Sequence, residues 1–183
     1  KQWDNYESWI HEFYITKINT ITLKTFYTVS ERIQWIYSTP DKDSTILGNE
    51  QWKWLKNELH IPAKIRIIAT STQFGHEYNG WESWTNVPHE RKKMLDLIKE
   101  TNTKGIFFIS GDVHWGEISK LNVEGLYPIY DITSSGLTQT WEAPEPNKNR
   151  IGEVVMENNF GLIEIHWEEP ILLTFKIIDY SSK

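Results

Sequence analysis

The sequence predicts an α/β protein built on a mixed β-sheet. Up to residue 110, short apolar runs that are typical of buried strands alternate with helical patterns, which favours a covered, partly parallel sheet. Beyond residue 110, strand-like runs follow one another without helical patterns, which indicates an antiparallel layer. A chain of 183 residues can bury one sizeable core, so we expect a single domain over residues 1–183.

The first elements follow from residue periodicity. Residues 18–27 alternate as a strand does, and Asn49 is expected to cap a helix that ends at His60. That helix carries Trp52, Leu55 and Leu59 on one stripe. Residues 64–69 contain Ile65, Ile67 and Ile68, which predict a buried strand.

The remaining elements follow a long loop over residues 71–87. Pro88 is expected to begin a helix, and residues 105–109 form a wholly apolar strand. The expected later strands are residues 118–123, 127–133, 160–167 and 171–179. Residues 168–170 are expected to form a hairpin turn, and residues 138–152 a surface loop.

Composition excludes several classes of function. A net charge of -6 and a pI near 5.5 argue against binding to a nucleic-acid backbone. The absence of cysteine excludes disulfides and thiolate metal ligands. No apolar stretch approaches the roughly 18 residues that a transmembrane helix needs.

Asp112 and His114 are the principal candidates for chemistry. They follow the apolar strand at residues 105–109, where open α/β sheets place their ligands. In extended backbone, side chains two residues apart point the same way, so both could reach one divalent ion. The alternative is a turn aspartate beside a packed histidine.

A second group of candidates lies around the 71–87 loop. Trp81, Glu82, Trp84 and Asn86 are expected either to wall a substrate site or to pin the loop with buried indoles. Arg91 could clamp a phosphate or form an ion pair with Glu82 or Asp96.

Four other polar residues receive structural interpretations. His76 is expected on the polar surface, and Glu117 either faces solvent or accepts a hydrogen bond from an imidazole. Ser134 and Ser135 lack the strand–serine–helix context of a nucleophile, so they are expected to support the backbone or a metal site.

Five segments, in order, resemble the PhoD-like alkaline phosphatases, a branch of the calcineurin-like metallophosphoesterases. They are residues 48–55 (GNEQWKWL), 71–74 with 80–91 (STQF and GWESWTNVPHER), 109–119 (ISGDVHWGEIS), 127–137 (YPIYDITSSGL) and 159–167 (NFGLIEIHW). Together they cover roughly residues 46–180, and an ordered set is far more specific than any one of them.

The resemblance implies the C-terminal half of a four-layer metallophosphoesterase sandwich, in which hydroxide attacks phosphorus at a dinuclear metal site. His114 would be a metal ligand, and Asp112 stands where many relatives have another ligating histidine. The implied cofactors are two or more divalent or trivalent metal ions, iron and calcium or else manganese or zinc. The implied substrate is a phosphomonoester or phosphodiester, either a small molecule or a lipid. Export to the periplasm or the extracellular space is also implied.

The chain departs from the family pattern in its first part. The motifs D-x-[HC], G-D-x-x-D and G-N-H-D do not occur in residues 1–110, and Lys24, Thr25 and Asn79 replace residues expected in relatives. We therefore expect a partial domain whose N-terminal half lies elsewhere. The alternative is an inactive or partial domain that acts as a binding module.

Overall fold

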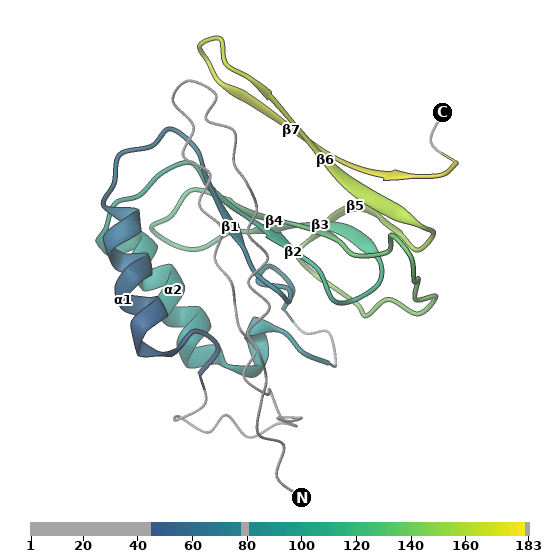
Figure 1. The fold of residues 1–183 in the computed structure, drawn as a ribbon, viewed down its shortest axis with the longest axis horizontal. Helices are drawn as coiled ribbons and strands as arrows, with labels where there is room; N and C mark the ends of the chain where they lie inside the picture. Colours follow the sequence, from purple (N-terminus) through teal and green to yellow (C-terminus); the bar gives the residue numbers. More distant parts are fainter. Residues whose placement is uncertain (1–44, 78–80, 182–183) are drawn as a thin grey trace, which may run out of the picture.

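The computed structural model describes residues 45–77 and 81–181 (Figure 1). The expected strand at residues 18–27 and the departures at Lys24, Thr25 and Asn79 lie outside these ranges. The described elements are α1 (Gly48–Leu59), β1 (Arg66–Ala69), the 3-10 turn η1 (Trp84–Asn86), α2 (Pro88–Glu100), β2 (Ile106–Ser110), β3 (Gly116–Leu121), β4 (Ile129–Ser134), β5 (Arg150–Val155), β6 (Asn159–His166) and β7 (Leu172–Asp179). Neither α-helix of the described part is long and apolar enough to cross a membrane.

The predicted mixed sheet is confirmed. Five strands lie in the order β1-β2-β4-β3-β5, and β6 with β7 forms a separate two-stranded sheet. Strands β1, β2 and β4 are parallel, whereas β3 is antiparallel to both of its neighbours. The carboxyl ends of the three parallel strands therefore meet at one edge of the sheet.

Strand β5 was missed by the sequence prediction, which assigned residues 138–152 to a loop. The strand begins at Arg150 and, of the described strands, pairs with β3 only, across a register shift. Gly152 has φ +73° within it, a conformation that interrupts strand-like side-chain alternation. An irregular edge strand of this kind leaves little periodic signal in the sequence.

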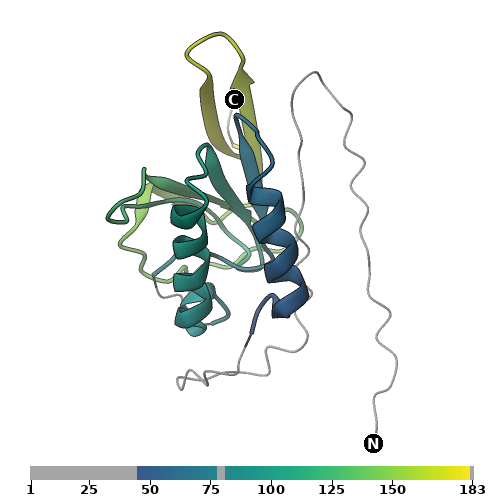
Figure 2. The same cartoon turned by 90° about the vertical axis from the view of Figure 1, so that its left-hand side faces the viewer.

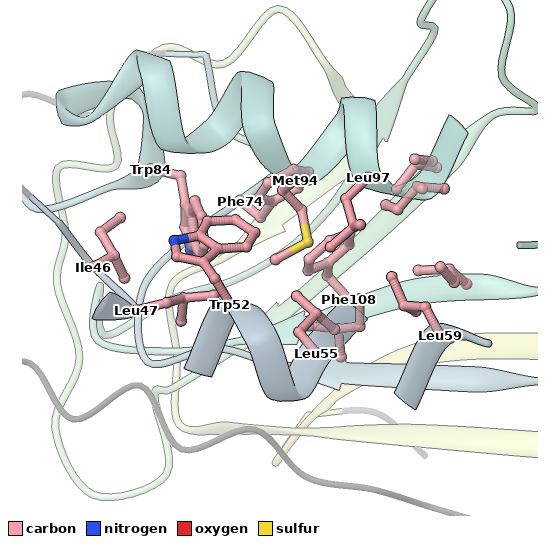
Figure 3. Packing of buried hydrophobic residues seen from close by; sticks show 14 of the residues in the cluster. Ile46, Leu47, Trp52, Leu55, Leu59, Phe74, Trp84, Met94, Leu97 and Phe108 are labelled. Carbon is pink, nitrogen blue, oxygen red and sulfur yellow. The ribbon is translucent and has the colours of Figure 1, made fainter. Parts of the chain in front are cut away.

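Helices α1 and α2 cover one face of the large sheet, as Figure 2 shows from the side. Figure 3 shows the core between them, where Trp84 packs edge-on against Trp52 and Phe74 with ring centroids 6.4 and 5.3 Å apart. Phe74 also stacks on Phe108 of β2 at 4.0 Å. The apolar stripe predicted for the first helix is confirmed, since Trp52, Leu55 and Leu59 are all buried.

Strands β6 and β7 lie on the opposite face of the large sheet. Phe175 of β7 contacts Phe107 of β2 with a centroid separation of 4.9 Å. The hairpin residues in this second cluster are only partly buried: Ile163, Ile165, Leu173, Phe175 and Ile177. The described part of the chain thus has three layers, two helices, a five-stranded sheet and a two-stranded sheet.

The start of α1 differs from the prediction. Asn49 does not cap the helix, because the helix begins at Gly48, whose amide donates to Thr45 Oγ1 over 2.8 Å. The buried carboxylate of Glu90, from α2, accepts hydrogen bonds from the amides of Ile46 and Leu47. The same carboxylate accepts from Thr45 Oγ1 and Trp52 Nε1, each at 2.6 Å. Glu90 therefore holds the segment that leads into α1, and through Trp52 it ties α1 to α2.

A second buried carboxylate, Asp131 of β4, ties the segment after β1 to the end of β2. Its Oδ2 accepts the amides of Phe74 and Gly75 at 2.9 and 2.7 Å, and its Oδ1 accepts the hydroxyl of Ser110 at 2.8 Å. Burial raises the pKa of Asp131 to about 6, although these hydrogen bonds oppose the shift. Asp131 thus joins the segment after β1 to the last residue of β2.

We predict that Glu90→Gln destabilises the fold by about 1–3 kcal/mol at pH 7, because a neutral amide cannot satisfy the same donors. Burial raises the pKa of Glu90, but the four hydrogen bonds together lower it below its ordinary value. The stabilisation is therefore present above the unfolded pKa and is lost as pH falls through the lower folded pKa. Urea unfolding at pH 7 and in acid measures the difference. Glu100→Gln, an exposed site in the same helix, is the control, and equal losses in the two variants would contradict the assignment.

We predict the opposite pH trend for Asp131. Its folded pKa of about 6 lies above the unfolded value near 3.9, so the folded state binds its proton more tightly. Its contribution to stability is full at low pH and is lost as pH rises from about 4 to about 6. Relative to the wild type, Asp131→Asn should gain up to about 3 kcal/mol across that interval. Chemical unfolding at closely spaced pH values tests this, with exposed Asp96→Asn as the control. Parallel stability curves for wild type and Asp131→Asn would refute it.

Candidate functional site

The candidate site is formed by three loops that follow the parallel strands. Trp81 and Glu82 come after β1, residues 112–115 come after β2, and Trp141 comes after β4. Since these strands end at the same edge, their loops converge there. The predicted position of Asp112 and His114 just past a strand end is confirmed.

The loops enclose a pocket of about 230 Å³. Its lining consists of Trp81, Glu82, Asp112, Val113, His114, Trp115 and Trp141. The structure therefore brings together four residues singled out in the sequence: Trp81, Glu82, Asp112 and His114. Trp141 was not predicted, because it lies in a segment that carries only loop signals.

The backbone at Asp112 and His114 is not extended, so the geometric argument from alternating side chains was wrong. Asp112 has φ +76° and His114 has φ +63°, both in the left-handed region that glycine prefers. Such a conformation costs a non-glycine residue on the order of 1–3 kcal/mol. Because two of three consecutive residues adopt this conformation, contacts with the rest of the protein must stabilise the loop. Backbone strain of this kind is often found at functional sites.

The surroundings that impose this shape come from the segment after β4. The Ser135 hydroxyl accepts the amide of His114 at 2.9 Å, and the Ser135 amide donates to the Trp115 carbonyl at 3.2 Å. The Trp141 amide donates to the His114 carbonyl at 3.0 Å. The expectation that Ser135 supports the backbone is therefore confirmed.

Asp112 and Glu82 give the pocket an acidic character. Although solvent still reaches Asp112, partial burial raises the pKa of its carboxyl, and repulsion from Glu82 raises it further. His114 opposes the shift. Among the residues that the structure describes, no lysine or arginine lines the pocket.

Asp112 and His114 are a suitable pair of donors for a metal ion, since a carboxylate and an imidazole suit hard and borderline cations. Two donors do not make a complete centre. Within residues 45–77 and 81–181, no three histidine, aspartate or glutamate side chains come together so that they could hold a metal.

Trp84, Asn86 and Arg91 lie outside the pocket lining. Trp84 is fully buried in the core, where its Nε1 donates to Thr70 Oγ1 at 2.8 Å. Asn86 Nδ2 donates to the carbonyl of Trp81 at 2.5 Å and so holds the loop that carries Trp81. These two residues can affect a ligand only through the loop.

Arg91 does not form either of the predicted ion pairs. Its Nε donates to the Phe74 carbonyl at 3.1 Å, and its guanidinium lies 3.9 Å from Glu77. Its other contact is with the ring of Phe74, 5.5 Å from the centroid. Arg91 therefore secures the loop after β1.

A buried polar network around Glu117 was missed by the sequence prediction. Glu117 is fully buried and accepts hydrogen bonds from Gln73 at 2.6 Å, from Asn147 at 3.2 Å and from Arg150. His76 is also fully buried, with Nε2 4.0 Å from Glu117, and burial lowers the pKa of its imidazole. Placing His76 on the surface and Glu117 in solvent was wrong, because their partners come from distant segments. The sequence gives no local pattern that predicts this burial. The polar residues that cluster in the loops after the strands indicate only that a network could form there.

Comparisons with known proteins give a consistent result. The model of the PhoD-like phosphatase family matches residues 17–159. Alkaline phosphatase D of Bacillus subtilis (strain 168) is 28% identical over 89 residues, which are 44% of this chain and 15% of that protein. The chain therefore spans well under two thirds of that relative.

Two solved structures share the fold. The structure of PhoD has a TM-score of 0.51 and 16% identity, over 78% of this chain and 36% of that one. GAP50, described as the anchor in the inner membrane complex of Plasmodium, has a TM-score of 0.53 and 14% identity, over 73% of this chain and 39% of that one.

The family match runs through most of the chain and includes all three loops of the pocket. The resemblance noted in the sequence is thereby confirmed, and this chain belongs to the PhoD-like phosphatase family.

Proposed function

We propose that this chain forms part of a metal-dependent phosphoester hydrolase in which Asp112 and His114 hold metal. The observation that carries the proposal is their placement: both have left-handed backbone, and both line one pocket where parallel strands end. Membership of a phosphatase family supports the hydrolase class.

The donor set is compatible with iron, calcium, manganese or zinc. When bound, metal ions would supply an activated water for attack on phosphorus and would neutralise phosphate charge. The described residues contribute two donors, so the other ligands would come from polypeptide outside the described ranges, including the N-terminal half expected from the resemblance. The same missing polypeptide would complete the four-layer sandwich by packing on the hairpin β6–β7, whose inner residues are only partly buried.

The remaining residues would shape the substrate site. Trp81 and Glu82 would contact the phosphoester, whether a small molecule or a lipid, because they line the pocket. Three residues outside the lining would act by holding the loop. Trp84 anchors it in the core, Asn86 donates to the Trp81 carbonyl, and Arg91 donates to the Phe74 carbonyl.

We predict that His114→Ala weakens metal binding by at least about tenfold, because it removes one of the two proposed metal ligands. Calorimetric titration with calcium, manganese, zinc and iron(II) measures the affinity. His166→Ala, at an exposed position on β6, is the matched control and should bind as the wild type does. Equal affinity in all three proteins would overturn the metal assignment.

The binding-module alternative is favoured by one observation, namely that the described residues supply only two donors. We expect this chain alone to turn over 4-nitrophenyl phosphate slowly or not at all. Turnover by the chain alone that disappears in His114→Ala would show that the centre closes without further polypeptide. Binding of neither metal nor phosphoester would favour the module.

We predict that Ser135→Ala lowers metal affinity by about tenfold or less, because the hydroxyl supports the His114 amide rather than reacting. The same titration measures this effect. A serine-directed phosphonylating reagent should leave the wild type unlabelled. Stoichiometric labelling that is lost in Ser135→Ala would instead establish a serine hydrolase.

A further inference from the structure

We propose that the pocket beside Asp112 and His114 is a subsite for an organic cation, the quaternary ammonium group of an amino-alcohol phosphoester. The ester part of this inference rests on the proposed function, whereas binding of the cation does not. The proposal rests on the indole content of the pocket, its charge, its size and the buried indole N–H of Trp115.

Three indoles line the pocket. Trp115 is 2% exposed and lies at the buried side of the pocket. Trp81 and Trp141, which are 44% and 45% exposed, lie at its solvent-exposed side. Trp141 Nε1 donates to the Ala143 carbonyl at 2.9 Å, which fixes this ring from its own loop. Indole faces attract cations, and groups of them are a recurring way to bind quaternary ammonium.

The charge of the pocket selects among ligands that indoles can bind. Glu82 and Asp112 are both in the lining, and within residues 45–77 and 81–181 no lysine or arginine is. An anionic group would add to the repulsion between the two carboxylates, and a neutral sugar or aryl group would leave it unchanged. An organic cation relieves it while covering the indoles, so the charge favours the cation.

The size of the pocket and the donor at Trp115 indicate what is attached to the cation. A volume of about 230 Å³ is below the usual range for drug-sized ligands, and it suits a compact head group. Trp115 Nε1 is buried and has no hydrogen-bond partner among residues 45–77 and 81–181. An N–H donor cannot serve an ammonium group, but it can serve an ester or hydroxyl oxygen. An amino-alcohol ester carries such an oxygen two carbons from its nitrogen.

The test is calorimetric titration of the whole chain, in chelator, with choline and with 3,3-dimethylbutan-1-ol, its neutral isostere. We expect choline to bind at least about tenfold more tightly, because the isostere keeps the shape and loses the charge. Trp81→Ala, Trp141→Ala and Glu82→Gln should each weaken choline binding by about fivefold or more. Trp167→Ala removes an indole of similar exposure (38%) outside the pocket and should have no effect.

Trp81→Phe keeps an aromatic face, so it should retain part of the affinity and should exclude misfolding as the cause of a loss. Equal binding of choline and its isostere would overturn the proposal. Tighter binding of methyl glucoside than of choline would also overturn it and would make the pocket a sugar subsite. The metal titrations of His114→Ala are read separately. Metal binding without choline binding would refute the subsite alone, and choline binding without metal binding would refute the proposed function alone.

Discussion

The buried carboxylate of Asp131 is the contact on which the arrangement of the pocket depends. It holds the amides of Phe74 and Gly75 from the segment after β1, and it holds the hydroxyl of Ser110 where β2 ends. One of these segments leads to Trp81 and Glu82, and the other leads to Asp112 and His114. A Cβ at Gly75 would lie 2.7 Å from the Asp131 Cβ, so the approach that brings the loop to the carboxylate requires glycine at that position. Three hydrogen bonds offset part of the cost of burying the group at the centre of the sheet, and the raised pKa of Asp131 reflects the part that remains.

The left-handed backbone at Asp112 and His114 needs a compensating force, and the segment after β4 supplies it. Ser135 and Trp141 hydrogen-bond the amide and the carbonyl of His114. The pocket is thus fixed by residues that lie more than twenty positions apart in sequence. These hydrogen bonds between distant segments keep the shape of the pocket while its loops remain at the surface. This suits a pocket in which side chains must be positioned against a ligand.

Periodic elements were predictable from the sequence, and contacts between distant segments were not. The stripe of Trp52, Leu55 and Leu59 appears in the order of the residues themselves, as does the apolar strand before Asp112. The burial of Glu117 depends on Gln73 and Arg150, 44 and 33 residues away, and no local pattern records either contact. The Asp112–His114 pair illustrates both cases. Its place at a strand end was predictable, but its orientation was not, because alternation of side chains holds only while the strand continues.

The acidity of the pocket constrains any function that involves phosphate. Two carboxylates, Glu82 and Asp112, line the pocket, and no basic side chain of the described residues does, so a phosphoester would be repelled unless positive charge entered with it or before it. A metal held by Asp112 and His114 would neutralise one carboxylate where phosphate binds. A cationic group on the ester would then meet the other carboxylate, Glu82, against the indoles of Trp81 and Trp141. The two proposals therefore assign different parts of one ligand to different parts of one pocket: the phosphate to the metal at Asp112 and His114, and the cationic group to Glu82 and the indoles.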